Sequence, residues 1–368
     1  MRSSLPTNVR SGPAENRWPR SRFPRTLEAM SIAVTPYDAA DPAAIDEAHR
    51  VAFAATAADQ PDFPNQTRDQ FAAYAANPMP GLTVLRALAR LDGVAAGHLE
   101  LRLPQLDNTD NASITLAVHP EHRRRGAGRA LLAYAIEVAR AHGRKRMFGD
   151  TVTALPGGPA RPEAGGAFAA TTGAQAALTE VRRRLDVAGV DHAALEELLA
   201  GARRRAAGYR GVAWHGPVPE EYVADVARLE GRMNTDAPIG DLELEAENID
   251  AERIRGTEEV LAARGRRHYH YGAVHEATGR LVAWTMLDVN GGIPWHAWQQ
   301  TTIVDPDHRG HRLGLLVKAE NLRYAVGYEP QLRAIDTWNA AVNEHMIRIN
   351  EQLGFRPVDG WTNWQLTI

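Results

Sequence analysis

Residues 118–128 read VHPEHRRRGAG, and residues 304–314 read VDPDHRGHRLG, 186 positions further along the chain. The two stretches share Val, Pro, His, Arg and the final Gly at five of eleven positions, without a gap. Each follows a segment of alternating polarity, which is typical of a strand, and opens an amphipathic segment, which is typical of a helix. The repeat therefore predicts two copies of one strand, turn and helix unit.

The turn between strand and helix has the chemistry of an anion-binding site. The first backbone N–H groups of a helix lack intrahelical partners, and the helix dipole favours negative charge there. Glycine lets a ligand approach the backbone closely, and arginine adds charge-assisted hydrogen bonds. Neither stretch matches GxGxxG or GxxxxGK[ST], and neither contains a lysine, so a P-loop nucleotidase is a poor fit. The pattern favours a phosphate or pyrophosphate ligand.

The repeated stretch resembles motif A of the GCN5-related N-acetyltransferases (GNATs), in which R-x-x-G-x-G follows a strand that ends V-x-P. The second half also resembles the family's segment of strand 5 and helix 4, through Thr337-Trp338-Asn339, Asn343, Met346, Asn350 and Leu353-Gly354-Phe355. The resemblance covers about residues 30–175 and 208–368. It implies a tandem GNAT architecture of the kind found among actinomycete acetyltransferases, including those of small-thiol and antibiotic biosynthesis.

The resemblance also implies that acetyl-CoA is the acyl donor and that no metal takes part. In the first half, the positions that would bind CoA are Ala117 and Val118 on the strand and Arg123, Arg124, Arg125, Gly126, Ala127, Gly128 and Arg129 in the turn. In the second half, they are Ile303 and Val304 on the strand, Arg309, Gly310, His311, Arg312, Leu313, Gly314 and Leu315 in the turn, and Asn339 and Asn343 at the pantetheine end.

Two departures from the family pattern distinguish the halves. Arg312 stands at the position of the first motif glycine, where a side chain fits if the residue stays helical and points away. The first half lacks the asparagines of the strand 5 and helix 4 segment, and residues 165–173 are its nearest relic. We therefore predict that the C-terminal half is catalytic and that the N-terminal half binds CoA or supports the structure.

The reaction implied by the family is direct attack of a neutral amine on the acetyl thioester, with a backbone N–H stabilising the oxyanion. It needs no covalent nucleophile, which agrees with a chain that has no Cys and only Ser113 after residue 31. Asn350 stands at the position of the family's usual tyrosine acid, and an amide cannot fill that role. His296, just before the second-half strand, is the candidate base, and a surface or core histidine is the alternative.

The segment 234–250 is acidic, and in this fold it would border the acceptor site. Its carboxylates include Asp236, Asp241 and Glu243, which could attract a cationic amine. A solvated acidic face is the alternative. His268 and His270 alternate along one predicted strand without a third ligand nearby, which favours packing over a metal site.

The order of predicted elements gives an α/β fold with a mixed sheet. Two GNAT-fold domains are expected at residues 30–175 and 208–368, joined by a helical connector at residues 176–207. Residues 1–29 interleave Arg and Pro without periodicity. They are expected to form a disordered tail or to reflect a misassigned start, and a targeting peptide is the other interpretation.

Composition narrows the class of function. The chain has 368 residues, 44% of them hydrophobic, and a net charge of −3, which gives no sign of nucleic-acid binding. It has no apolar run of 18 residues, so no membrane span is expected. We therefore predict a cytoplasmic N-acetyltransferase of a small-molecule amine, of the kind used in antibiotic-type secondary metabolism. A non-catalytic CoA-binding sensor or scaffold and a protein N-acetyltransferase are the alternatives.

Overall fold

The computed structural model describes residues 31–368, in which twelve strands form one mixed sheet. The predicted tail at residues 1–29 lies outside the described residues. The first half contributes strands β1 (Ile32–Pro36), β2 (Leu82–Leu91), β3 (Val94–Pro104), β4 (Asn111–Val118), β5 (Arg146–Ala154) and β6 (Gln175–Asp186). Its helices are α1 (Pro42–Asp59), α2 (Arg68–Ala76), α3 (Ala127–Ala141), α4 (Ala164–Ala170) and α5 (His192–Arg205).

The second half repeats this order. Its strands are β7 (Tyr209–His215), β8 (Arg266–His275), β9 (Leu281–Asn290), β10 (His296–Val304), β11 (Ala334–Ala340) and β12 (Arg356–Thr367). Its helices are α6 (Glu220–Glu230), α7 (Met233–Asp236), α8 (Ala251–Ala263), α9 (Leu313–Tyr328) and α10 (Glu344–Gln352). The two repeated stretches join β4 to α3 and β10 to α9, which confirms the predicted strand, turn and helix units.

Local sequence accounts for several of these elements. Asp92 and Gly93 both have positive φ, at 50° and 85°, so they form the tight turn between β2 and β3 that such a pair favours. Thr67 caps α2, since its side chain accepts from the backbone of Gln70 while the Gln70 side chain accepts from the backbone N–H of Thr67.

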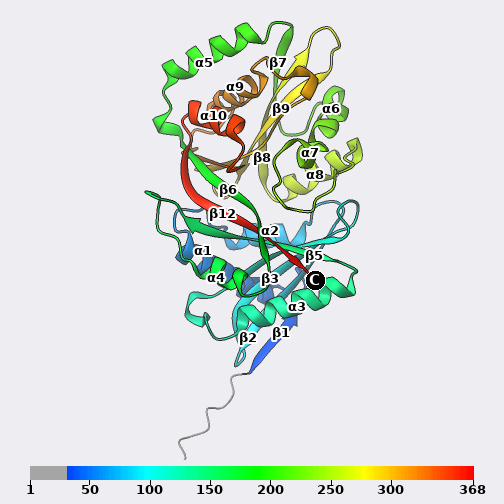
Figure 1. The fold of residues 1–368 in the computed structure, drawn as a ribbon, viewed down its shortest axis with the longest axis vertical. Helices are drawn as coiled ribbons and strands as arrows, with labels where there is room; N and C mark the ends of the chain where they lie inside the picture. Colours follow the sequence, from blue (N-terminus) through cyan, green and yellow to red (C-terminus); the bar gives the residue numbers. More distant parts are fainter. Residues whose placement is uncertain (1–30) are drawn as a thin grey trace, which may run out of the picture.

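The two halves exchange strands at the centre of the sheet. The strand order is β1-β2-β3-β4-β5-β12-β6-β11-β10-β9-β8-β7. The C-terminal strand β12 therefore lies between β5 and β6 of the first half, and β6 pairs in turn with β11 of the second half. Figure 1 shows β6 and β12 crossing between the two lobes, with the C-terminus in the lobe formed by the first half.

The predicted helix at residues 176–207 is wrong in its first part, because residues 175–186 form β6. Leu178, Val181 and Leu185 have a spacing that fits a helix, but β6 hydrogen-bonds to a strand on each side. These tertiary hydrogen bonds outweigh the weak local preference for a helix. The second part is helical as predicted, since α5 spans His192–Arg205.

Helices cover both faces of the sheet and form its cores. In the first half, α3 packs on one face and α1 with α2 on the other. In the second half, α9 with α5 and α10 packs on one face, and α6 with α8 on the other. Figure 1 shows the α9 and α6 groups on opposite sides of the upper lobe.

Candidate functional site

The N-terminal copy of the repeat leads into α3, and no side chain caps the N-terminus of that helix. Gly126 has φ 93°, a left-handed conformation that glycine adopts without penalty, and it redirects the chain into α3. No side chain caps α3, and Ala130 is the first residue whose N–H bonds back, to the Gly126 carbonyl at 3.0 Å. The N–H groups of residues 127–129 thus lack intrahelical partners and can bind an anion.

A cavity of about 740 Å³ opens onto this helix end. Its volume lies within the range of about 300–1,000 Å³ that ligand pockets occupy. It is lined by the end of α1, the second part of β4, the start of α3, most of β5, α4 and the exchanged strand β12. The predicted CoA-binding residues on its wall are Ala117, Val118, Arg123, Arg124, Gly126, Ala127, Gly128 and Arg129.

The arginines of this turn have different partners. Arg123 donates to the Val118 carbonyl at 3.2 Å and makes two hydrogen bonds to Asp59, at 2.8 and 2.9 Å, so it braces the turn against α1. Arg125 lies 3.3 Å from a ring nitrogen of His122. Arg124 and Arg129 line the cavity and make no ion pair within residues 31–368, so their charge is available to an anionic ligand.

The C-terminal turn has a related but more occupied arrangement. Arg309 donates to the Val304 carbonyl at 3.4 Å and to Asp236 at 3.0 Å, which matches the bracing of Arg123 by Asp59. His311 packs against Tyr209, with ring centroids 5.3 Å apart. Arg309 thus has protein partners, and the ring of His311 is packed against Tyr209, so neither side chain is free for a ligand.

Arg312 differs from its sequence-based expectation in one respect. It is not helical but left-handed, with φ 58°, and so adopts the conformation of its counterpart Gly126. Its side chain does point away, towards α5: a Cβ built on Gly201 would lie 3.4 Å from the Arg312 Nη1. No side chain caps α9, so the N–H groups of Leu313, Gly314 and Leu315 remain without intrahelical partners. Gly310 precedes them with φ 87°.

In both halves two parallel strands diverge beside the turn. β4 pairs with β5 only at residues 111–113, and β10 pairs with β11 only at residues 296–298. Ala117, Val118, Ile303 and Val304 therefore lie on strand ends that no neighbouring strand pairs with on this side. The carbonyls of Val118 and Val304 accept from Arg123 and Arg309. Only β10 carries a bulge here, because residues 300 and 301 together oppose Met286 of β9, whereas β4 pairs with β3 without a break. A bulge leaves its extra residue out of the ladder.

The predicted asparagines lie on β11 and at the two ends of α10. Asn343 caps that helix by accepting from the Met346 N–H at 3.2 Å. Asn350 is fully buried and donates to the side chain of Asn339, while its own carbonyl oxygen has no protein partner. These three side chains lie on or next to the strand that diverges from β10. Asn350 is placed for structure, and its amide supplies no acidic proton.

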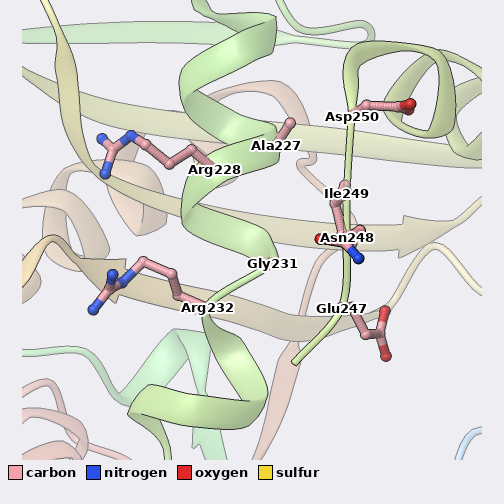
Figure 2. A pocket seen from close by; sticks show the side chains of 8 residues that line it. All are labelled: Ala227, Arg228, Gly231, Arg232, Glu247, Asn248, Ile249 and Asp250. Carbon is pink, nitrogen blue, oxygen red and sulfur yellow. The ribbon is translucent and has the colours of Figure 1, made fainter. Parts of the chain in front are cut away.

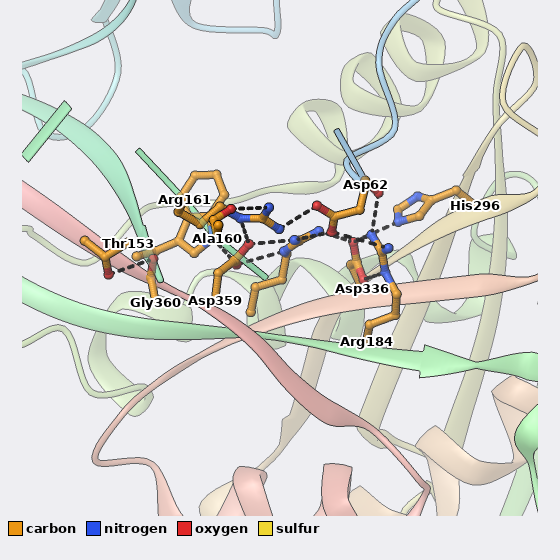
Figure 3. A network of polar contacts seen from close by, with 11 residues as sticks. Asp62, Thr153, Ala160, Arg161, Arg184, His296, Asp336, Asp359 and Gly360 are labelled. Carbon is orange, nitrogen blue, oxygen red and sulfur yellow. Dashed lines mark hydrogen bonds and ion pairs between the residues drawn. The ribbon is translucent and has the colours of Figure 1, made fainter. Parts of the chain in front are cut away.

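His296 lies in a buried charge network between the halves, shown in Figure 3. Its Nε2 is 3.1 Å from Asp336, which also accepts from Arg182 and Arg184. Arg182 reaches on to Asp62 and Asp359. Arg161 bonds Asp359 at 2.9 Å and Asp62 at 2.5 Å.

Burial sets the protonation of this network. It lowers the pKa of His296 from its ordinary value, although the hydrogen bond to Asp336 opposes the change. Burial alone would raise the pKa of Asp336, but hydrogen bonds from Arg184 and His296 hold that pKa well below its usual range. A neutral His296 can accept a proton, yet its side chain is only 2% exposed. The structure places it in the interface between halves.

The predicted substrate carboxylates do not form one cluster. Asp236 pairs with Arg232 and Arg309. Asp241 bonds through its backbone N–H to the Ala177 carbonyl at 2.8 Å. Glu243 pairs with Arg146 of the first half at 2.7 Å and accepts from Gln365 of the exchanged strand β12 at 3.0 Å. Much of the segment therefore serves as contact between the halves.

A second cavity, of about 430 Å³, lies between α6 and the segment that precedes α8 (Figure 2). It is lined by Ala227, Arg228, Gly231, Arg232, Glu247, Asn248, Ile249 and Asp250. Arg228 and Arg232 extend away from the facing carboxylates in Figure 2, and each has an acidic partner elsewhere, Asp305 and Asp236. The cavity thus has no unpaired cation on its helical wall.

Sequence reasoning missed several residues of the larger cavity. Asp59, Asp150, Trp361 and Trp364 line it, and the last two come from the exchanged strand. Asp59 could have been suspected from its place at the end of α1, but no local pattern marks the others. Within residues 31–368 no three His, Asp or Glu side chains gather as metal ligands do, and no helix there is both long and apolar enough to cross a bilayer.

Comparisons with known proteins agree with this architecture. A family model for the acetyltransferase (GNAT) family matches residues 45–156. A search of curated protein sequences finds no match. Among solved structures, the chain is similar in fold to a GCN5-related N-acetyltransferase from Sphaerobacter thermophilus, at 15% identity, with 91% of this chain and 95% of that chain covered and a TM-score of 0.58.

A stronger likeness extends to the sequence. The chain is 33% identical to a tandem GNAT protein from the clavulanic acid biosynthesis pathway, with 92% of this chain and 98% of that chain covered and a TM-score of 0.77. Identity at this level over nearly both chains goes beyond a shared fold, and it includes the tandem arrangement. The chain therefore belongs to the GCN5-related N-acetyltransferase (GNAT) family.

Proposed function

We propose that this protein transfers an acetyl group from acetyl-CoA to the amine of a small molecule, by direct attack within a ternary complex in the cytoplasm. The observation that carries the proposal is the 740 Å³ cavity, which joins an uncapped helix end to a gap between diverging strands. That combination suits a ligand with a pyrophosphate at one end and an extended arm at the other.

The N-terminal half is the CoA-binding half in this proposal. Arg124, Arg129 and the N–H groups at the start of α3 would hold the pyrophosphate, and the free edge of β4 at Ala117 and Val118 would pair with the pantetheine arm. Arg123 would act indirectly, since Asp59 and the Val118 carbonyl already occupy its guanidinium. The bound thioester supplies an activated acyl group, and the chain supplies its orientation.

The C-terminal half is the catalytic half in this proposal. The bulge in β10 frees backbone at residues 300–301 beside the gap between β10 and β11, where an N–H can stabilise the developing oxyanion. The N–H groups of residues 313–315 would bind the donor's pyrophosphate there. His296 remains the proposed base, and Asp236, Asp241 and Glu243 the proposed acceptor contacts.

The likeness to a protein of clavulanic acid biosynthesis supports a role in antibiotic-type secondary metabolism. We propose GNAT units at residues 30–175 and 208–368, with residues 176–207 as a connector that contains the strand β6 as well as the helix α5. Because β6 pairs with β11 and β12 while β12 also pairs with β5, the sheet is continuous between the two units.

Two matched substitutions test the roles of the halves. G128E and G314E each place a negative side chain at the start of α3 or α9, where it would repel a pyrophosphate. We expect G314E to lower the rate of thiol release with a panel of amines at least about tenfold. We expect G128E to lower the affinity for acetyl-CoA at least about tenfold. A tenfold change corresponds to the loss of one charge-assisted hydrogen bond or more. Calorimetry and a thiol assay measure the two effects.

G128A and G314A are the controls. A Cβ at either position would meet its nearest neighbours at 3.5 Å, an ordinary contact, so both variants are expected to behave like the wild type. If G128E alone removes turnover, the catalytic half is the N-terminal one. If wild-type protein binds acetyl-CoA but acetylates no amine and no peptide, the protein is a CoA-binding sensor or scaffold.

A further inference from the structure

The large cavity of the N-terminal half passes through the sheet. On one side its wall is formed by Gly128 of α3 and by α4, where a Cβ on Gly165 would lie 3.3 Å from the Thr151 side chain. On the other side it is formed by Thr56 and Gln60 at the end of α1. Because β4 and β5 diverge between these walls, the cavity connects the two faces of the sheet.

Asp150 of β5 faces the side of the cavity opposite to α3. Met147 packs in the core beneath α3, and side chains alternate along a strand, so Asp150 points to the face covered by α1. It lines the cavity and stays exposed to it. A donor held by the start of α3 would present its thioester through the gap, and Asp150 lies on the far side of that gap.

The carboxylate of Asp150 is not used by the protein. It makes no ion pair and no side-chain hydrogen bond with another residue in the described chain, residues 31–368. Its charged neighbours already have partners: Arg102 pairs with Glu100 at 2.5 Å and with Thr115 at 3.1 Å, and Glu180 accepts from Asn363 at 2.9 Å. Although the carboxylate of Asp150 faces the cavity, the protein atoms around it shield it from bulk water and raise its pKa; Arg102 opposes this effect and Glu180 adds to it.

We propose that Asp150 binds the ammonium group of an acceptor amine and accepts its proton, which makes the N-terminal half a second acetyl-transfer site. This inference rests on the proposed function and extends it. A primary ammonium can fill the hydrogen-bonding capacity of a free carboxylate, and the unpaired cations that line the cavity, Arg124 and Arg129, belong to the turn and the start of α3.

The proposed transfer removes two protons from the acceptor nitrogen and replaces the thioester bond with an amide bond. Asp150 takes one proton from the ammonium, and the neutral amine forms a C–N bond with the acetyl carbon as the C–S bond breaks. A second proton leaves the nitrogen for the thiolate, so the products are an amide and CoA thiol. Asp150 returns its proton to water at the α1 end of the cavity. Transfer here is slower than in the C-terminal half, since β4 has no bulge.

The test uses the full chain with the C-terminal turn disabled. The G314E variant is expected to keep a measurable residual thiol release with primary amines. Adding D150N should lower the kcat of that residual activity at least about a hundredfold, the usual contribution of a positioned proton acceptor, with acetyl-CoA affinity unchanged. The residual activity should rise with pH through a pKa above that of an ordinary aspartate, and D150N should abolish this rise.

The control is D69N in the same background. Asp69 on α2 is 96% exposed and lies off the cavity, so this equal change of charge should leave the residual activity unchanged. If G314E abolishes all turnover while acetyl-CoA still binds, or if D150N and D69N behave alike, the inference about Asp150 is overturned and the proposed function stands. If the wild type turns over no amine, both fail together.

Discussion

A chain that ends at Gly354 is expected to fold in neither half, although it keeps every residue of the two predicted GNAT units except the last strand. β12 pairs with β5 on one side and with β6 on the other, so its loss leaves two unpaired edges in the middle of the sheet. It also removes Trp361 and Trp364 from the wall of the large cavity. Circular dichroism should show loss of the cooperative unfolding transition, and calorimetry should show loss of acetyl-CoA binding.

The expected loss of stability is a large fraction of the free energy of unfolding of a typical domain. Asp359 of β12 is fully buried and accepts from Arg161 and Arg182, whose side chains are fully buried as well. Removing one partner of a buried ion pair costs about 3–5 kcal/mol, and a typical domain has about 5–15 kcal/mol of stability in total. The lost strand pairing on both sides adds to this cost.

A peptide of residues 355–368, added to the truncated chain, should restore acetyl-CoA binding, and a shuffled peptide of the same composition should not. Two results would count against the exchanged-strand account. One is a truncated chain that unfolds cooperatively and still binds acetyl-CoA. The other is equal rescue by both peptides.

The elements that depend on local patterns were predictable from the sequence. The hairpin at Asp92-Gly93 follows from two residues that tolerate positive φ, and the repeated turns follow from a strand pattern, a glycine and a helix pattern in immediate succession. The ligand-binding turn of the first half was predictable as well, because the helix N-terminus and its arginines are adjacent in the chain. The structure places this turn in the wall of the large cavity.

The exchange of strands was not predictable, because it depends on contacts between residues far apart in the chain. The apolar residues of β6 have a spacing that fits a helix, but the segment forms a strand because it hydrogen-bonds to β11 and β12. The same limit applies to the site. Asp59 pairs with Arg123 at a separation of 64 residues, and Trp364 donates to Thr151 at a separation of 213 residues. No local sequence pattern predicts contacts over such separations.

The D336N variant is expected to lose about 3–5 kcal/mol in the free energy of unfolding, measured with urea at pH 7. Asp336 is fully buried and bonds Arg182, Arg184 and His296 at once; Figure 3 shows its contacts with Arg184 and His296. An amide of the same size keeps the packing but leaves Arg184 with only Asp62, at 3.6 Å, as a charged partner. D69N on the exposed surface should change stability by less than about 0.5 kcal/mol.

The pH dependence of this difference separates charge from packing. The pKa of Asp336 is held below its unfolded value, so its stabilisation is complete above an unfolded pKa of about 3.9 and declines as pH falls towards the lower folded value. The gap in unfolding free energy between wild type and D336N should therefore be constant from pH 7 to about pH 5 and narrow below about pH 4. A gap that persists unchanged at the lowest pH where both proteins fold would assign the effect to packing and remove the buried charge network as the link between the halves.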